Sequence, residues 1–213
     1  MKLRGRFVSL STLLIASLFV LAAPVFAQES LDVYVGTVTN QVEARKTPID
    51  TFGNGVLYNA PQMTGAFPKF GANLKLNSWF GVGGEMSWRA SKGDYAALMY
   101  RPFFYDFYGM YTPPTKSKWF VPELQAGMGA ANLRFYYDQR LCNNFTGCRT
   151  SSSLVGTDNK FTTHFGGGFK TFIHNNWYVK PEFKLRWVND FFQFGRNWVP
   201  EYGVSVGYTF GGR

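Results

Sequence analysis

Only two histidines, His164 and His174, offer a side chain that could act as a general base near neutral pH. A serine hydrolase needs such a histidine beside a serine and an orienting carboxylate. His164 has no serine nearby in the sequence, and His174 begins the turn-like run His-Asn-Asn. Two histidines and two cysteines are also few ligands for a metal. We therefore predict no catalytic, cofactor-binding or metal-binding residue, and interpret His164 as a packed, hydrogen-bonded side chain.

Charged residues instead recur at alternate positions within apolar runs. Because side chains of a strand point to opposite faces in turn, such charges share one face and the apolar residues share the other. Nine charges fall on faces predicted to point inward: Glu85, Arg89, Arg101, Glu123, Lys180, Glu182, Lys184, Arg186 and Glu201. Opposite charges enclosed in a narrow interior must pair, since an unpaired buried charge is costly. We predict a network of ion pairs that fills the interior; an ion path or gate is the alternative.

The N-terminus has the organisation of an export signal. Met1–Arg6 is basic, Phe7–Ala23 is apolar, and Val25–Ala27 supplies a small-residue exit. This pattern predicts a signal peptide, residues 1–27, cleaved before Gln28, and leaves residues 28–213 as one domain. An uncleaved anchor is the alternative. No later run approaches the ~18 apolar residues that a transmembrane helix needs.

The two cysteines, Cys142 and Cys148, lie six positions apart. In an exported chain such a pair predicts a local disulfide that closes a hairpin tip. Because the closed loop is short, its stabilisation should lie at the low end of the usual ~2–4 kcal/mol.

The elements that position these residues are strands, because period-two alternation recurs in eight segments. Trp198–Phe210 is the clearest, with aromatic and aliphatic side chains at even positions and small or polar ones at odd positions. In the segment 95–106 we place Tyr100 and Phe104 on the outer face and Arg101 on the inner face. The other predicted strands are residues 31–39, 68–76, 79–89, 119–133, 160–173 and 177–189.

The predicted connections alternate between long and short along the chain. The long ones are residues 41–66, 91–94, 138–159 and 190–197, and the short ones are 77–78, 112–118 and 174–176. Eight strands of roughly ten residues with this rhythm are typical of a membrane-spanning barrel. We therefore predict an all-β fold: an eight-stranded antiparallel up-and-down transmembrane β-barrel, closed by the last strand against the strand that begins at Leu31. At this size, side chains fill the bore.

The composition agrees with a membrane barrel. Aromatic residues make up 19% of the chain, 23 residues are glycine, and the formal net charge is +9 with the basic residues scattered. An exported protein seldom meets nucleic acid, so we predict no nucleic-acid partner. Anionic outer-membrane lipids and lipopolysaccharide are the expected partners of the positive charge.

The mature chain resembles the small eight-stranded outer-membrane barrels of diderm bacteria, the OmpA transmembrane-domain and OmpX-like group. The resemblance rests on the architecture and on the segments Trp177–Arg186 and Tyr202–Phe210. The resemblance covers residues 29–210 and implies an integral outer-membrane protein. It also implies that Tyr208 and Phe210 form the terminal signal read by the barrel-assembly machinery, although this chain adds Gly211-Gly-Arg213. Lipid-A-modifying barrels carry a His-x-Ser pair on a late strand, which is absent here.

The sequence therefore favours a non-enzymatic, monomeric outer-membrane barrel with a side-chain-plugged lumen. Its long loops, residues 41–66 and 138–159, would contact an unknown ligand or support envelope integrity. The alternatives are a lipid-modifying enzyme that uses His164 with a carboxylate, and a small-solute pore. A soluble β-sandwich or lipocalin-like carrier is the structural rival.

Overall fold

The computed structural model describes residues 30–42, 50, 53–58, 63–95, 98–117, 119–143, 147–191, 194 and 196–211. The predicted signal peptide, residues 1–27, lies outside these ranges, as do part of the loop 41–66 and the last two residues. No helix among the described residues has the length and apolarity needed to span a membrane.

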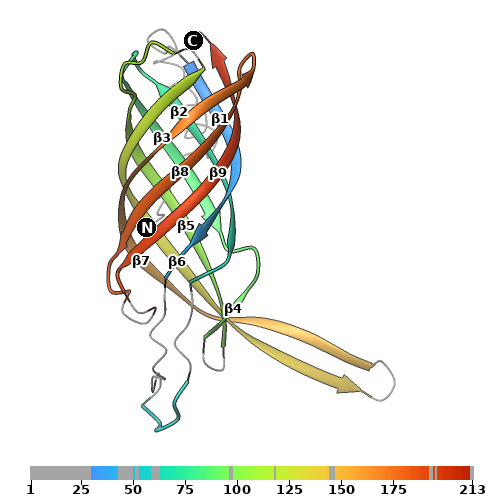
Figure 1. Cartoon of the computed structure of the whole chain (residues 1–213). Coiled ribbons are helices and arrows are strands. Elements are labelled where there is room, and N and C mark those ends of the chain that lie inside the picture. Colours follow the sequence, from blue (N-terminus) through green and yellow to red (C-terminus); the bar gives the residue numbers. More distant parts are fainter. Residues whose placement is uncertain are drawn as a thin grey trace, which may run out of the picture.

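Antiparallel strands form a closed ring in the described part of the chain (Figure 1). Their bounds are β1 Ser30–Asn40, β2 Ala66–Lys75, β3 Phe80–Trp88, β4 Gly93–Tyr95, β5 Leu98–Tyr111, β6 Phe120–Asn143, β7 Gly147–His174, β8 Trp177–Val188 and β9 Trp198–Gly211. Each long strand pairs with its neighbours in the chain, and β3 pairs with β5, so the short β4 only extends the start of β5. The eight-stranded up-and-down barrel is confirmed.

The ring closes where the two ends of the barrel chain meet. β1 pairs with β9 from Ser30 opposite Gly211 to Asn40 opposite Glu201. This closure leaves the main strands of the barrel without a free edge, which is the arrangement that lets strands cross a bilayer with their backbone groups paired. The predicted contact between the closing strand and the strand at Leu31 is confirmed, since Leu31 lies opposite Phe210.

Short turns join the strands at one end of the barrel. The Asn77 side chain accepts the backbone N–H groups of Trp79, at 2.9 Å, and Phe80, at 2.8 Å, and so closes the β2–β3 turn. In the β7–β8 turn Asn175 takes a positive φ of 46°, a conformation that asparagine tolerates better than most residues. The predicted tight turns are therefore present.

The six tryptophans mark the two ends of the barrel. Three lie at the short-turn end: Trp79, Trp119 and Trp177. Three lie at the opposite end: Trp88, Trp187 and Trp198. Aromatic rings prefer the headgroup level of a bilayer, so these two girdles bracket the apolar outer band.

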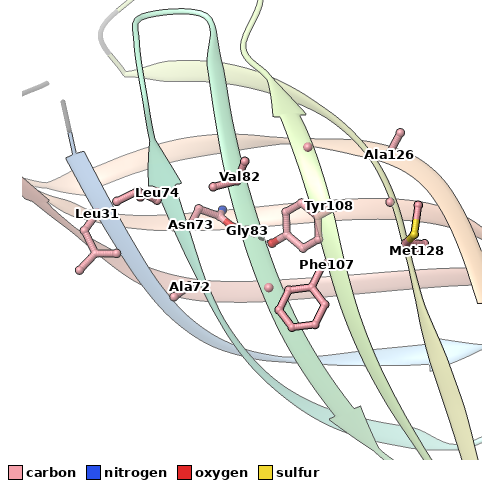
Figure 2. Close-up of a pocket in the computed structure, with 13 residues that line it drawn as sticks. Leu31, Ala72, Asn73, Leu74, Val82, Gly83, Phe107, Tyr108, Ala126 and Met128 are labelled. Carbon is pink, nitrogen blue, oxygen red and sulfur yellow. Dashed lines mark hydrogen bonds between the residues drawn. The ribbon is translucent and has the colours of Figure 1, made fainter. Parts of the chain in front are cut away.

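The outer band is not smooth. Small residues on neighbouring strands leave a shallow hollow of about 620 Å³, between β1 and β6, on the lipid-facing side (Figure 2). Its lining combines the small residues Ala72, Gly84 and Ala126 with the larger Phe107 and Met128. The hollow is almost wholly apolar, so hydrocarbon chains can fill it.

The described residues between 138 and 159 form two paired strands and not the predicted irregular loop. β6 and β7 remain paired as far as Asn143 opposite Gly147, and the paired arms project beyond the barrel (Figure 1). The register shifts next to Phe135, where Val155 is the extra residue of a bulge. The prediction failed because both faces of this hairpin meet water, so its residues show no alternation between apolar and polar side chains.

The faces predicted for residues 95–106 are reversed. Tyr100 and Phe104 point into the lumen and are 0% exposed, while Arg101 lies on the outer side. The prediction equated the apolar face with the lipid face. That rule fails here because the outer half of the lumen is filled by apolar side chains.

Candidate functional site: the lumenal charge network

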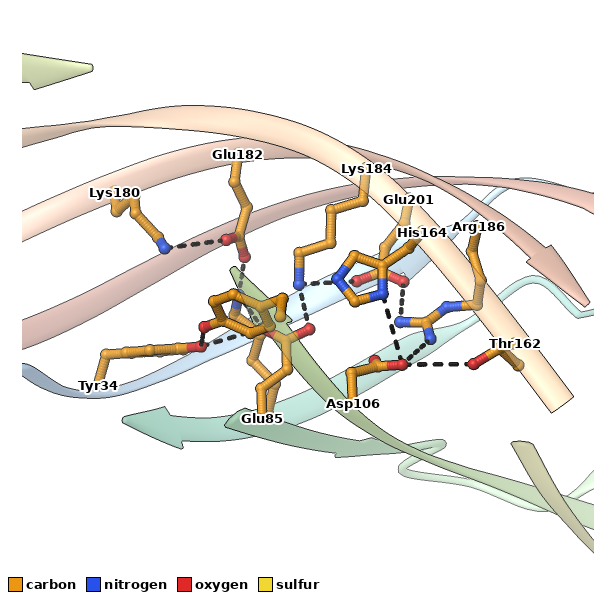
Figure 3. Close-up of polar contacts among 12 residues, drawn as sticks. Tyr34, Glu85, Asp106, Thr162, His164, Lys180, Glu182, Lys184, Arg186 and Glu201 are labelled. Atoms are coloured by element: carbon orange, nitrogen blue, oxygen red, sulfur yellow. Dashed lines mark hydrogen bonds and ion pairs between the residues drawn. The ribbon is translucent and has the colours of Figure 1, made fainter. Parts of the chain in front are cut away.

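Alternation along each strand brings twelve buried ionisable side chains into the lumen. The described lumenal carboxylates are Asp32, Glu85, Asp106, Glu123, Glu182 and Glu201. The described lumenal bases are Lys69, His164, Lys170, Lys180, Lys184 and Arg186. Figure 3 shows that many of these side chains converge from strands on different sides of the ring.

At the short-turn end the network begins with Lys170. Its ammonium contacts Asp32 and lies 2.5 Å from Glu123 Oε1. Thr209 Oγ1 also donates a hydrogen bond to Asp32 Oδ1 at 2.6 Å. Lys180 then lies between Glu123, at 3.6 Å, and Glu182, at 3.5 Å.

In the middle of the lumen two lysines share Glu85. Lys184 contacts Glu85 directly and lies 3.8 Å from Glu201, and Lys69 contacts Glu182 and lies 3.7 Å from Glu85. Tyr34 adds a hydroxyl that donates to Glu85 at 3.0 Å. Each carboxylate therefore meets more than one donor, as a buried charge requires.

Close approach of a tyrosine ring explains one of the strand glycines. A Cβ at Gly83 would lie 2.6 Å from the ring of Tyr108, whose hydroxyl donates to Asn73 Oδ1 at 2.6 Å. A glycine in a strand leaves room for a large ring that approaches the backbone closely. Gly83 has this role.

Toward the outer end Arg186 bridges two carboxylates. Its guanidinium lies 2.7 Å from Asp106 and 3.2 Å from Glu201, and its side chain is 0% exposed. Asp106 also lies 3.6 Å from His164 Nδ1, and the His164 ring meets Tyr108 edge-on at 5.8 Å between ring centroids. His164 is thus a packed lumenal side chain beside a carboxylate and a tyrosine.

Beyond Arg186 the lumen becomes apolar. Thirteen buried side chains pack at the outer mouth: Val38, Val42, Met63, Phe67, Tyr95, Tyr100, Phe104, Ala131, Leu133, Val188, Phe191, Phe194 and Val199. The Phe191 and Phe194 rings come from the connection before β9 and stack at 4.4 Å between centroids. The charged layer is therefore covered on its outer side.

The structure brings together seven of the nine predicted network residues. These are Glu85, Glu123, Lys180, Glu182, Lys184, Arg186 and Glu201. Two do not join its ion pairs within the described chain. Arg89 lies over the Tyr100 ring, 5.4 Å from its centroid, and Arg101 donates outside the lumen to the carbonyls of Arg89 and Ala90. Assigning Arg101 to the lumen was wrong because the faces of its strand were reversed.

Four members of the network were missed from the sequence: Asp32, Lys69, Asp106 and Lys170. Lys69, Lys170 and Asp32 each alternate with apolar neighbours, so the period-two pattern already placed them on a polar face. Asp106 was missed because the prediction reversed the two faces of its strand and so placed this residue on the outer side. Among the described residues no group of three or more His, Cys, Asp or Glu side chains could hold a metal ion.

The projecting hairpin carries the cysteine pair. Cys142 and Cys148 are opposite each other near its tip and form a disulfide, as predicted. At the base of the hairpin Lys92 lies 2.9 Å from Asp138 and also contacts Ser152. The hydrogen bond from Ser152, followed by the one from Lys92, lowers the pKa of the partly exposed Asp138 carboxyl.

The predicted assembly signal lies at the short-turn end of β9. The Phe210 ring is 51% exposed and meets Tyr208 at 4.8 Å between centroids. Tyr208 in turn meets Trp177 edge-on at 5.3 Å. The three rings therefore form a cluster on the outer face of the closing strand, and its role in assembly stays a prediction.

Comparison with solved structures finds the same fold at low identity. Neisserial surface protein A is 13% identical, over 85% of this chain and 96% of that one, with a TM-score of 0.51. OprG from Pseudomonas aeruginosa is 11% identical, over 86% and 96%, with a TM-score of 0.52. Ail of Yersinia pestis, in complex with the heparin analogue sucrose octasulfate, is 12% identical, over 85% and 98%, with a TM-score of 0.50. No curated protein matches the chain.

The family model of the outer membrane protein beta-barrel domain matches residues 13–210. This range includes every strand of the closed ring, and the ring, the apolar outer band and the two tryptophan girdles are the features that such a domain requires. The predicted family and location are confirmed. The chain belongs to the outer membrane protein β-barrel family and is an integral protein of the outer membrane.

Proposed function

We propose that this protein is a non-enzymatic, monomeric outer-membrane barrel whose own side chains close its lumen. Its outer hairpin and loops form a surface for contact with a partner or for support of the envelope. Residues 1–27 act as the signal peptide, and the Tyr208–Phe210 end is read by the barrel-assembly machinery. Outer-membrane lipid and lipopolysaccharide surround the apolar band.

The observation that carries this proposal is the continuous pairing of buried charges across the lumen. The paired side chains that run from Asp32 and Lys170 to Asp106 and Arg186 are at most 6% exposed. A conducting path would have to break several of these pairs and desolvate an ion beside them. The apolar cluster at the outer mouth is a second barrier to water and ions.

The surface role is supported by the projecting hairpin. Its paired arms continue well past the bulge at Val155, carry exposed apolar side chains such as Leu154, and end at a disulfide. A paired, cross-linked element pays less conformational entropy on binding than a flexible loop of the same length. On this basis the hairpin is the main contact surface.

Single-channel recording in planar bilayers tests the closed lumen. The folded wild-type barrel should give no stable conductance steps. The charge-balanced variant Glu85→Ala/Lys184→Ala removes a central pair and should conduct. Its matched control, Asp158→Ala/Lys160→Ala, removes an ion pair (3.1 Å) whose partly exposed side chains lie outside the network and should stay silent. Reproducible steps from the wild type would contradict the proposal.

Lipid A analysis separates this function from that of a lipid-modifying enzyme. His164 is buried in the lumen, on the opposite side of the wall from lipid. Lipid A from expressing cells should therefore keep its mass, with the wild-type protein and with a folded His164→Ala variant alike. A mass change that disappears with His164→Ala would favour the enzyme.

A further inference from the structure

Arg101 and Arg134 form a cross-strand pair of like charges on the outer face of the barrel. They lie directly opposite each other on β5 and β6. Like charges in this position repel, and the pair lies near the outer end of the barrel wall. Nothing in the closed lumen requires this pair, so its two positive charges need a separate explanation.

Hydrogen bonds hold both guanidiniums without neutralising them. Arg101 donates to the carbonyl oxygens of Arg89, at 2.9 Å, and Ala90, at 3.2 Å. Arg134 Nε donates to Asn132 Oδ1 at 3.1 Å. These acceptors are uncharged, and within the described ranges neither arginine forms an ion pair. Both side chains therefore keep donors free for an anion.

The pair lies at the outer headgroup level. Two positions nearer the membrane centre, Trp88 and Phe103 face each other and stack at 6.3 Å between centroids, with 12° between their planes. Trp88 belongs to the girdle at the end remote from the short turns, which in the outer membrane is the outward-facing end. Together with Pro102 and Tyr136, these four residues line a pocket of about 320 Å³.

We propose that this pocket binds a phosphate group of lipopolysaccharide from the outer leaflet. The two guanidiniums carry the positive charge and the parallel N–H donors that a phosphate group binds. A phosphate bound between them would replace their mutual repulsion with attraction of each arginine to the anion. The stacked rings below would contact the adjoining sugar and the start of the acyl chains. This site depends on the outer-membrane location and is independent of whether the lumen is closed.

Binding of lipopolysaccharide to barrel refolded in detergent tests the site. The Arg101→Gln/Arg134→Gln variant should bind about tenfold more weakly or worse, since it loses charge-assisted hydrogen bonds at two positions. The control Arg149→Gln/Arg196→Gln removes two exposed charges, one from the projecting hairpin and one from the β8–β9 connection, and should change affinity less than about twofold. Heat-modifiable migration on a gel shows that each variant is folded.

Two further probes identify the group that is bound. Dephosphorylated lipopolysaccharide should bind the wild type as weakly as intact lipopolysaccharide binds the site variant, and inorganic phosphate should not compete at millimolar concentration. An equal loss of affinity in the site variant and in the control variant would show only general attraction between positive charge and lipopolysaccharide, and would overturn the assignment of this site. Tight binding of dephosphorylated lipid, or equal competition by free phosphate, would also overturn the assignment.

Discussion

Arg186 has no exposed surface and depends wholly on the carboxylates of Asp106 and Glu201. A buried ion pair adds little net stability compared with a well-packed apolar pair, but removal of one partner leaves the other charged and unsolvated. The same reasoning applies to each lysine of the network. Substitution of one charged residue in this lumen therefore lowers stability mainly because its former partner stays buried without a counter-charge.

The Arg186→Met variant should lose about 3–5 kcal/mol of unfolding free energy, because Asp106 and Glu201 both lose their closest cation. Adding Asp106→Asn should recover part of this loss. Urea titration of the barrel in lipid vesicles, followed by tryptophan fluorescence, measures both values. Arg196→Met, an exposed arginine in the β8–β9 connection, is the matched control and should stay near the wild type. Equal stability of the two single variants would show that Arg186 is not part of an essential pair.

Among the elements, the β6–β7 hairpin differs from the barrel wall because water covers both of its faces. At its base Lys92 bridges Asp138 on one arm and Ser152 on the other. Lys92 belongs to the connection between β3 and β4, so this contact links the hairpin to another outer segment. The hairpin is therefore tied to the barrel by polar contacts that respond to pH.

The pKa of Asp138 is lower in the folded protein than in the unfolded chain, so the ionised carboxylate stabilises the fold. This stabilisation is fully present above the pKa of the unfolded chain and is lost as pH falls through the pKa of the folded protein. The Ser152→Ala variant removes the largest cause of the shift and should raise the pKa of Asp138 toward its ordinary value. Carbon-detected NMR titration of the Asp138 carboxyl in detergent micelles measures the pKa. An unchanged pKa in Ser152→Ala would contradict the contact.

The closing strand β9 provides the second prediction at this scale. Phe210→Ala should lower the amount of protein in the outer membrane several-fold while changing the unfolding free energy little, because the ring is half-exposed at the rim. Immunoblotting of membrane fractions and urea titration supply the two readouts. Phe161→Ala removes a similarly exposed ring on β7 and should not lower the amount. Wild-type levels of the Phe210 variant would argue against an assembly signal.

For the whole molecule, the closed hydrogen-bonded ring is the source of stability. No edge among the eight main strands is free to open, so unfolding must break a full strand–strand contact within a bilayer or micelle. Folded protein extracted in detergent should therefore migrate differently on an SDS gel before and after boiling. Identical migration, or recovery of the protein in the soluble periplasmic fraction, would contradict a membrane barrel.

The sequence predicted the two faces of a strand correctly where one face is apolar and contacts lipid and the other carries charged side chains that point into the lumen. In Trp177–Val188 the alternation is complete, and Lys180, Lys184 and Arg186 all lie in the lumen as expected. It failed where the two faces have the same character. Tyr100 and Phe104 face the lumen while Phe103 and Tyr105 face outward, so both faces of β5 carry aromatic rings. The described residues of the β6–β7 hairpin are hydrated on both sides, so that segment shows no alternation either.

The pairing within the network was beyond the sequence for a different reason. Lys170 contacts Asp32 across 138 positions of the chain, and the two residues lie on strands that are not neighbours in the ring. Which lumenal side chains reach the same level depends on strand tilt and stagger, which no local pattern encodes. Ten of the eleven ion-pair members could be placed on a polar face from the sequence, all but Asp106, but which of them meet depends on the three-dimensional arrangement of the strands.

The distribution of lumenal charge among the strands limits how the barrel can fold. β7 and β8 together carry four of the five described lumenal Lys and Arg side chains and a single lumenal carboxylate, Glu182. The other carboxylates come one each from β1, β3, β5, β6 and β9: Asp32, Glu85, Asp106, Glu123 and Glu201. A β7–β8 hairpin that entered the bilayer alone would bring uncompensated lysines to the midplane, at about 2–4 kcal/mol each. Insertion and closure must therefore be concerted, with the inner face kept hydrated until the acidic strands have arrived.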